Sequence, residues 1–127
     1  MLLVRISLRQ GKPAAYRKAI GDGVHQALVE AISVPPLDRF QIITEHAPEG
    51  LIYDPEYLGI RRTDDVVFIQ ITLNAGRTLE LKKALYTRIA ELLQQNPGVR
   101  PEDVFINLTE VPRENWSFGN GIAQYAQ

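Results

Sequence analysis

The chain has 127 residues, of which 45% are hydrophobic and none is cysteine, and its formal net charge is −1. This composition is typical of one globular domain, residues 1–127. It excludes disulfides and thiolate chemistry, and it gives no electrostatic reason to expect nucleic acid or an anionic membrane as a partner. No apolar run approaches the roughly 18 residues of a membrane span, so a soluble cytoplasmic protein is expected.

The first elements follow from hydrophobic periodicity. Alternating apolar and polar side chains over residues 2–9 predict a strand that ends before Gly11. An apolar stripe with a spacing of four then predicts a helix over 13–32, and a strand over 39–45 follows. The stripe consists of Tyr16, Ile20, Val24, Leu28 and Ile32.

The second half of the chain repeats the first. When the sequence is shifted by 65 residues, Gly76 lies on Gly11, and no gap is needed from residue 3 to residue 45. The two βαβ repeats therefore span 2–45 and 66–110. The second repeat has predicted strands over 66–73 and 103–110 and a predicted helix over 78–95, with Thr78 as its N-cap.

Two βαβ units predict an α/β (α+β) fold, a four-stranded mixed sheet with two helices on one face. The other face would carry Leu3, Phe40, Ile42, Phe68 and Phe105, which is too apolar a set for water. Self-association would cover this face. Alternatively, the connection 46–65 and the aromatic tail 111–127 fold back over it.

Arg77 is a candidate for anion binding. It lies where a predicted strand turns into a helix, and free N–H groups and the helix dipole favour an anion there. A substrate carboxylate could bind its guanidinium in a bidentate way, although a solvated Arg77 is the alternative. Lys12 is the matching residue of the first repeat. His25 and His46 lack partners at metal-ligand spacing, and no metal site is expected.

Asp38 is a candidate general acid or base. Asp103 matches it in the second repeat, and both aspartates follow a proline by two residues, which indicates a shared turn. Only an asymmetric environment, such as a partner subunit over one of them, would give Asp38 a catalytic role.

The sequence resembles the tautomerase superfamily, and within it the branch that contains malonate semialdehyde decarboxylase. The phrases that carry the resemblance are VPPLDRFQIITEH, DDVVFIQITLNAGRTLELKKALY, PEDVFINLTEV and NWSFGNG. The resemblance implies a homotrimer built on the open sheet face, pockets near the beginnings of the first strands, and neither a metal nor an organic cofactor.

The resemblance also implies an N-terminal proline, exposed by removal of the initiator methionine, whose secondary amine moves a proton on a keto–enol substrate. Here Leu2 occupies the position of that proline. Leucine supplies no secondary amine, and Met1 is expected to be retained because methionine is normally removed only before a small residue. The terminal amine is then displaced by about 3.3 Å along a strand.

Other family residues match in part. Asp38 matches the aspartate that activates water in the decarboxylase, and Arg77 matches the second of its two substrate-binding arginines. Asn74-Ala75 stands where the family has Arg-Pro. Trp116 and Phe118 match an aromatic tail that lines the pocket.

Three hypotheses follow. The first is a homotrimeric tautomerase with a pocket for a small carboxylate or 2-oxo acid, whose activity is weak or lost because of Leu2. The second is a non-catalytic, ligand-binding or structural trimer. The third is an enzyme that uses another base, namely the Met1 amine, Asp38 or His46.

Overall fold

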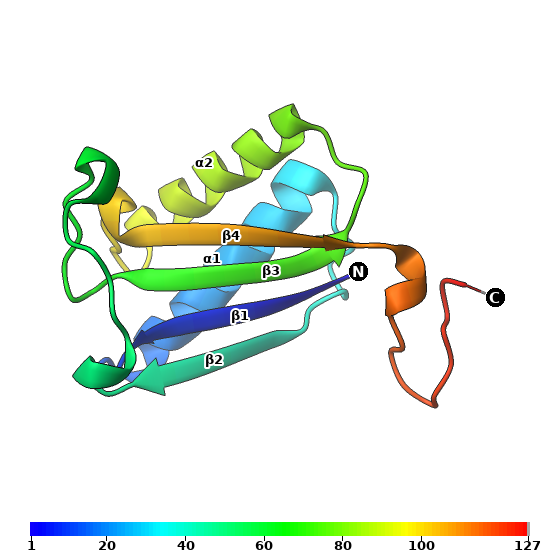
Figure 1. Ribbon diagram of the computed structural model, residues 1–127, viewed down its shortest axis with the longest axis horizontal. Helices are drawn as coiled ribbons and strands as arrows, with labels where there is room; N and C mark the ends of the chain where they lie inside the picture. The colour runs from blue at the N-terminus through cyan, green and yellow to red at the C-terminus, as the bar shows by residue number, and fades with distance from the viewer. Residues whose placement is uncertain (127) are drawn as a thin grey trace.

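The computed structural model describes residues 1–126 and contains one sheet and two long helices (Figure 1). The strands are β1 (Leu2–Arg9), β2 (Gln41–His46), β3 (Val67–Asn74) and β4 (Val104–Val111), and the helices are α1 (Ala14–Ile32) and α2 (Leu79–Gln95). The strand order is β2-β1-β3-β4, with β1–β2 and β3–β4 parallel and β1–β3 antiparallel. The predicted fold is confirmed.

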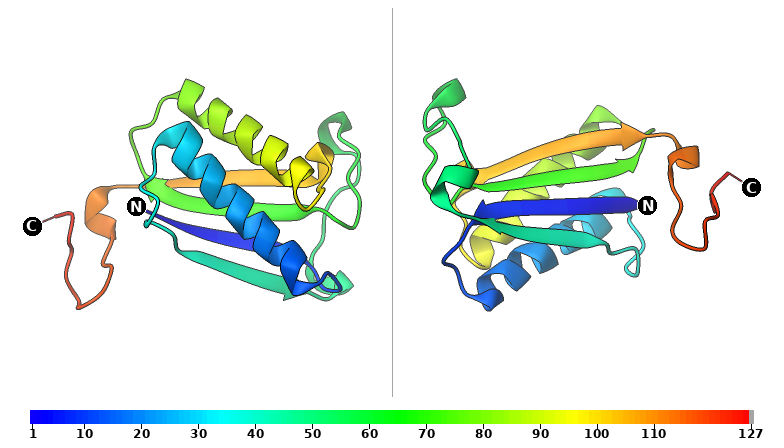
Figure 2. Two further views of the ribbon diagram at one scale, coloured as in Figure 1. Left: turned by 180° about the vertical axis from the view of Figure 1, so that it is seen from behind. Right: turned by 60° about the horizontal axis from the view of Figure 1, so that its bottom comes forward.

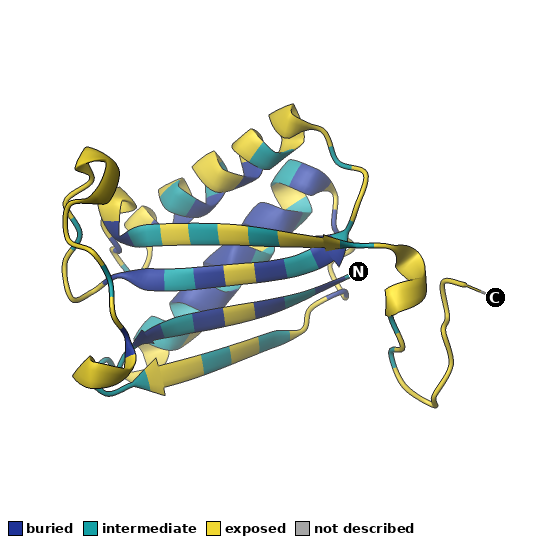
Figure 3. Ribbon diagram, in the orientation of Figure 1, coloured by how far each residue is buried: buried dark blue, intermediate teal, exposed yellow. Residues whose placement is uncertain are grey.

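Both helices lie on one face of the sheet and enclose the core there (Figures 2 and 3). The alternation along β1 explains this, because Leu2, Val4, Ile6 and Leu8 all point to that face and are buried. In α1, Gly23 allows close packing against α2, since a Cβ atom at this position would lie 2.8 Å from Leu93 Cδ2.

The predicted boundaries of the elements shift by one or two residues. Pro13 and Thr78 lie just outside their helices as N-caps, and the Thr78 side chain accepts a hydrogen bond from Leu81 N at 3.3 Å. The second and fourth strands were predicted to begin too early. Turns precede both, in which Asp38 N and Asp103 N donate to the carbonyl groups three residues before them.

The two repeats pair in the same register. Val4 lies opposite Gln41 in the first repeat, and Ile69 lies opposite Ile106 in the second. Adding 65 to both residue numbers of the first pair gives the second pair. The antiparallel β1–β3 pairing, which sets Leu2 opposite Leu73, relates the repeats by an approximate two-fold axis through the sheet. Each end of the sheet therefore presents one strand beginning and the neighbouring strand ending.

The sheet face without helices remains largely open. Phe40, Ile42 and Phe105 are 48%, 40% and 47% exposed, although all three are apolar. The connection between β2 and β3 forms two short 3₁₀ helices and reaches over one end of this face, where Ile52, Tyr53 and Tyr57 form a hollow with Phe68 and Phe105. The alternative to self-association, in which the connection and tail fold back over this face, therefore holds only in part.

No helix among residues 1–126 is long and apolar enough to cross a membrane.

Candidate functional site

The candidate site lies at the end of the sheet where β1 begins and β3 ends. The N-terminus and the segment after β4 meet there (Figure 1). The α-amine nitrogen of Met1 lies 3.1 Å from Asp38 Oδ2. Asp38 is brought to this point by the turn between α1 and β2, while β1 carries the amine to it.

Leu2 contributes packing at this site and no reactive group. It is 2% exposed and belongs to the same buried cluster as Val4 and Ile6. Its nitrogen is a peptide amide, which is not basic, so the basic nitrogen at the start of β1 is that of Met1.

Asp38 and Asp103 have different environments despite their equivalent positions. Asp103 is 1% exposed and accepts hydrogen bonds from Thr63 N and Thr63 Oγ1 at 2.7 Å and 2.6 Å. Asp38 is 7% exposed, and within residues 1–126 neither of its carboxylate oxygens has a hydrogen bond of good geometry. The Met1 amine is its ion-pair partner. The asymmetry that a catalytic role for Asp38 requires therefore exists within one chain and needs no partner subunit.

Asn74 connects Arg77 and Trp116 at the end of β3. Arg77 Nη1 donates to the Asn74 backbone oxygen at 3.1 Å, and Trp116 Nε1 donates to Asn74 Oδ1 at 2.8 Å. Since Leu2 lies opposite Leu73, the same register continued by one residue sets Met1 opposite Asn74. The arginine and the tryptophan are therefore brought to the strand end that neighbours the amine.

Aromatic rings form one side of the site. Phe118 stacks on Trp116 with a centroid distance of 5.4 Å, meets Tyr125 edge-on at 5.4 Å, and lies 6.5 Å from Phe40. The 3₁₀ helix Arg113–Asn115 turns the chain after β4 so that these tail residues reach the site. Only Gln127 of the predicted tail lies outside the described residues.

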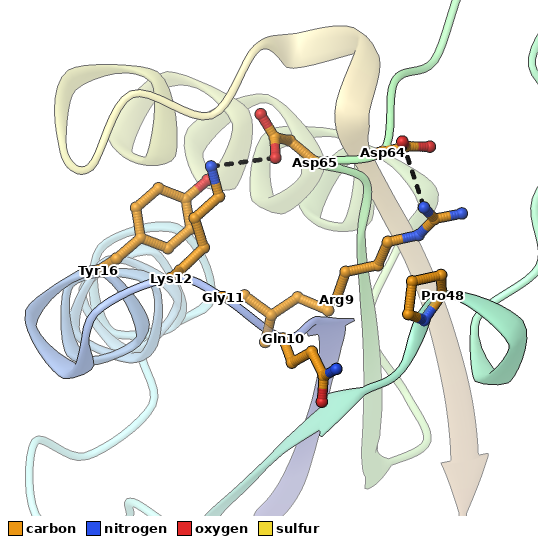
Figure 4. Close-up of a pocket in the computed structure, with 9 residues that line it drawn as sticks. Arg9, Gln10, Gly11, Lys12, Tyr16, Pro48, Asp64 and Asp65 are labelled. Carbon is orange, nitrogen blue, oxygen red and sulfur yellow. Dashed lines mark ion pairs between the residues drawn. The ribbon is translucent and has the colours of Figure 1, made fainter.

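The other candidates lie elsewhere. Lys12 is at the opposite end of the sheet, paired with Asp65 (Figure 4). This pairing raises the pKa of Lys12, chiefly through its hydrogen bond with the Asp65 carboxylate. His25 Nε2 lies 2.8 Å from the Pro36 carbonyl oxygen, and His46 closes β2 at the far end from Met1. Residues 1–126 contain no group of three His, Cys, Asp or Glu side chains that could hold a metal ion.

Two features of the candidate site were not predicted from the sequence. Asn74 was noted only as a departure from the family pattern, and the contact of the Met1 amine with Asp38 was not expected. The antiparallel register of β1 and β3 would have placed Asn74 beside Met1, but a single sequence does not reveal that register.

Comparison with known proteins decides the family. A family model described as "Tautomerase enzyme" matches residues 38–119, and a second with the same description matches residues 3–61. The chain is 44% identical to the probable tautomerase YusQ of Bacillus subtilis (strain 168), over 98% of both chains. It belongs to the tautomerase family.

Solved tautomerase-family structures agree with this assignment. The crystal structure of FG41 malonate semialdehyde decarboxylase inhibited by 3-bromopropiolate is 45% identical, with a TM-score of 0.91 over 97% of this chain and 93% of that one. A second malonate semialdehyde decarboxylase is 32% identical, with a TM-score of 0.91 over 97% and 95%. A symmetric trimer of fused 4-OT has 26% identity and a TM-score of 0.80 over 98% of both chains.

Proposed function

We propose that this tautomerase-family protein moves a proton on a small carboxylate or 2-oxo acid at the site formed by Met1, Asp38, Arg77, Trp116 and Phe118. The observation that carries the proposal is the ion pair of 3.1 Å between the Met1 amine and the buried Asp38. It places a nitrogen base next to a carboxylate, which stabilises the protonated amine.

The chemistry needs only one mobile proton. Arg77 binds the carboxylate of an enol acid, and the Met1 ammonium, held by Asp38, gives a proton to the enol carbon. This breaks an N–H bond and forms a C–H bond. The amine then takes the proton of the enol O–H group, which breaks that O–H bond and forms an N–H bond, and the enol has become its keto acid.

The same arrangement gives a reason for slow turnover. The reactive nitrogen belongs to Met1, one residue before the position that proline has in the family, and a misplacement of about 1 Å already costs on the order of a hundredfold. Leu2 in the place of proline therefore favours a second candidate, a trimer that binds the carboxylate without converting it.

Replacing Arg77 with alanine tests the substrate side. We expect kcat/KM for the ketonisation of phenylenolpyruvate to fall about 10- to 100-fold, mainly through KM, because the charged partner of the carboxylate is lost. The matched control is Lys12→Ala, which removes the equivalent cation of the first repeat and should leave kcat/KM unchanged.

Three results are informative. Equal effects of the two substitutions would contradict the site. If the wild type has no turnover, but binds phenylpyruvate and loses that binding only in Arg77→Ala, the non-catalytic candidate replaces the enzyme. An active wild type that becomes inactive when its α-amine is acetylated supports the amine as the base.

A homotrimer built on the open sheet face completes the proposal, since Phe40, Ile42 and Phe105 are exposed on one surface. Sedimentation velocity should give three times the chain mass of 14.3 kDa. Phe105→Glu should dissociate the assembly with an unchanged far-ultraviolet spectrum, whereas Tyr86→Glu, an exposed aromatic on α2, should not. A monomeric wild type would contradict the trimer.

A further inference from the structure

The opposite end of the sheet provides an internal comparison for the candidate site. The shift of 65 residues that relates the repeats sets Arg9 on Asn74 and Lys12 on Arg77. The strand registers obey the same shift, so these residues have equivalent places at the two ends. The groups that bind Arg9 and Lys12 at the opposite end therefore indicate which kind of group can bind at Asn74 and Arg77.

At the opposite end both cations are neutralised by carboxylates of the chain itself (Figure 4). Arg9 Nη1 lies 3.2 Å from Asp64 Oδ2, and Lys12 Nζ lies 3.1 Å from Asp65 Oδ1. The two aspartates come from the segment before β3 and line the same hollow as Arg9 and Lys12. Two cations at these positions thus hold two carboxylates.

The candidate site has only half of this charge pattern. Arg77 keeps the cation, and among residues 1–126 no carboxylate lies within 4.0 Å of its guanidinium. The nearby Glu110 is paired with Lys82, which lowers the pKa of Glu110. Asn74 replaces the second cation by a neutral amide. With one cation, Arg77, and one neutral amide, Asn74, the candidate site can hold one carboxylate, and that carboxylate must come from a ligand.

The orientation of the Asn74 amide is fixed by chemistry. Trp116 Nε1 can only donate, so the amide atom that it contacts at 2.8 Å is the oxygen Oδ1. The amide nitrogen Nδ2 consequently keeps its two N–H groups, and the residues described offer it no hydrogen-bond acceptor. A neutral oxygen of a ligand can accept from this group.

We propose that Asn74, oriented by Trp116, is a specificity-determining residue that donates to a carbonyl or enol oxygen of a ligand whose single carboxylate binds Arg77. The site would thereby select monocarboxylates over dicarboxylates. This inference rests on the proposed function for its location, and it deepens that function by assigning the substrate class. Trp116 acts through Asn74 and is a positioning residue.

The test compares kcat/KM for phenylenolpyruvate, which has one carboxylate, with that for 2-hydroxymuconate, which has two. The wild type should prefer the monocarboxylate at least about tenfold, and Asn74→Arg should abolish or reverse this preference. Trp116→Phe keeps the ring but removes the donor, and should reduce the preference itself rather than kcat for both substrates alike. Arg9→Asn, the equivalent change at the opposite end, should leave the preference unchanged.

A preference that is the same in wild type and Asn74→Arg would overturn the inference while leaving the proposed function intact. If no variant turns over, the proposed enzyme fails, and the binding of phenylpyruvate and of muconate, measured by competition, replaces the rates. A monocarboxylate preference in binding that Asn74→Arg reverses would still support the role of Asn74, and an unchanged preference would refute it.

Discussion

Asp38→Asn is expected to lower kcat by at least about 100-fold, the usual contribution of a group that supports proton transfer. The substitution keeps the shape of the side chain but removes the negative charge that stabilises the protonated Met1 amine. The free energy of unfolding should change little, because the substitution loses the ion pair with the Met1 amine but also removes the cost of burying a carboxylate that has no well-formed hydrogen bond. Steady-state kinetics and urea unfolding measure the two effects.

Asp103→Asn is the matched control and should behave in the opposite way. Asp103 accepts two hydrogen bonds from Thr63 in a buried position, so its replacement should cost about 1–3 kcal/mol of stability. Activity at a temperature where the variant is folded should be retained. If the two substitutions had the same effects on stability and rate, Asp38 would be a turn residue like its counterpart.

Leu2→Pro is expected to raise kcat/KM by about 10- to 100-fold. A small residue after Met1 allows the methionine to be removed, so this variant begins with a secondary amine at the position where the family has one. The change also removes a side chain that is 2% exposed in the core, and a truncation of this kind costs about 2–5 kcal/mol. Intact mass spectrometry must accompany the kinetics to establish which residue begins each protein.

Leu2→Ala distinguishes the effect of a secondary ring amine from the effect of moving the terminal amine to position 2. Alanine also permits the removal of Met1 and loses the same packing, but it leaves a primary amine. If Leu2→Ala gains as much as Leu2→Pro, the position of the amine matters and not the ring. A wild type as fast as Leu2→Pro would show that Leu2 does not limit the reaction.

Much of the fold could be predicted because the signals are local and are present twice. The four-residue stripe of α1 and the alternation of β1 each identify an element, and the 65-residue repeat supports the same elements in the second half. The second and fourth strands begin later in the structure than the sequence predicted, at Gln41 and Val104. The turns at Asp38 and Asp103 bond to their own preceding carbonyl groups, and this competition with strand pairing is not visible in a periodicity.

The site was predictable only in its parts. Arg77 and Asp38 were proposed from their positions in the sequence, and family resemblance supplied the pocket role of Trp116 and Phe118, whereas the arrangement of all four depends on the antiparallel register of β1 and β3. The role of Thr63 was also hidden, because nothing in the sequence shows that a residue of the connection reaches Asp103, 40 positions later. Contacts of this range are decided by tertiary structure.

The pairing of Arg9 and Lys12 with Asp64 and Asp65 at one end of the sheet has a consequence for the evolution of the chain. A duplicated βαβ unit begins with two equivalent ends, and fusion leaves only one of them with a free amino group. The fused end can then accumulate substitutions that strengthen folding, such as a threonine bonded to a buried aspartate, without loss of chemistry. In the proposed function, stability and reactivity thus depend on opposite ends of one small sheet, and selection can adjust each almost independently of the other.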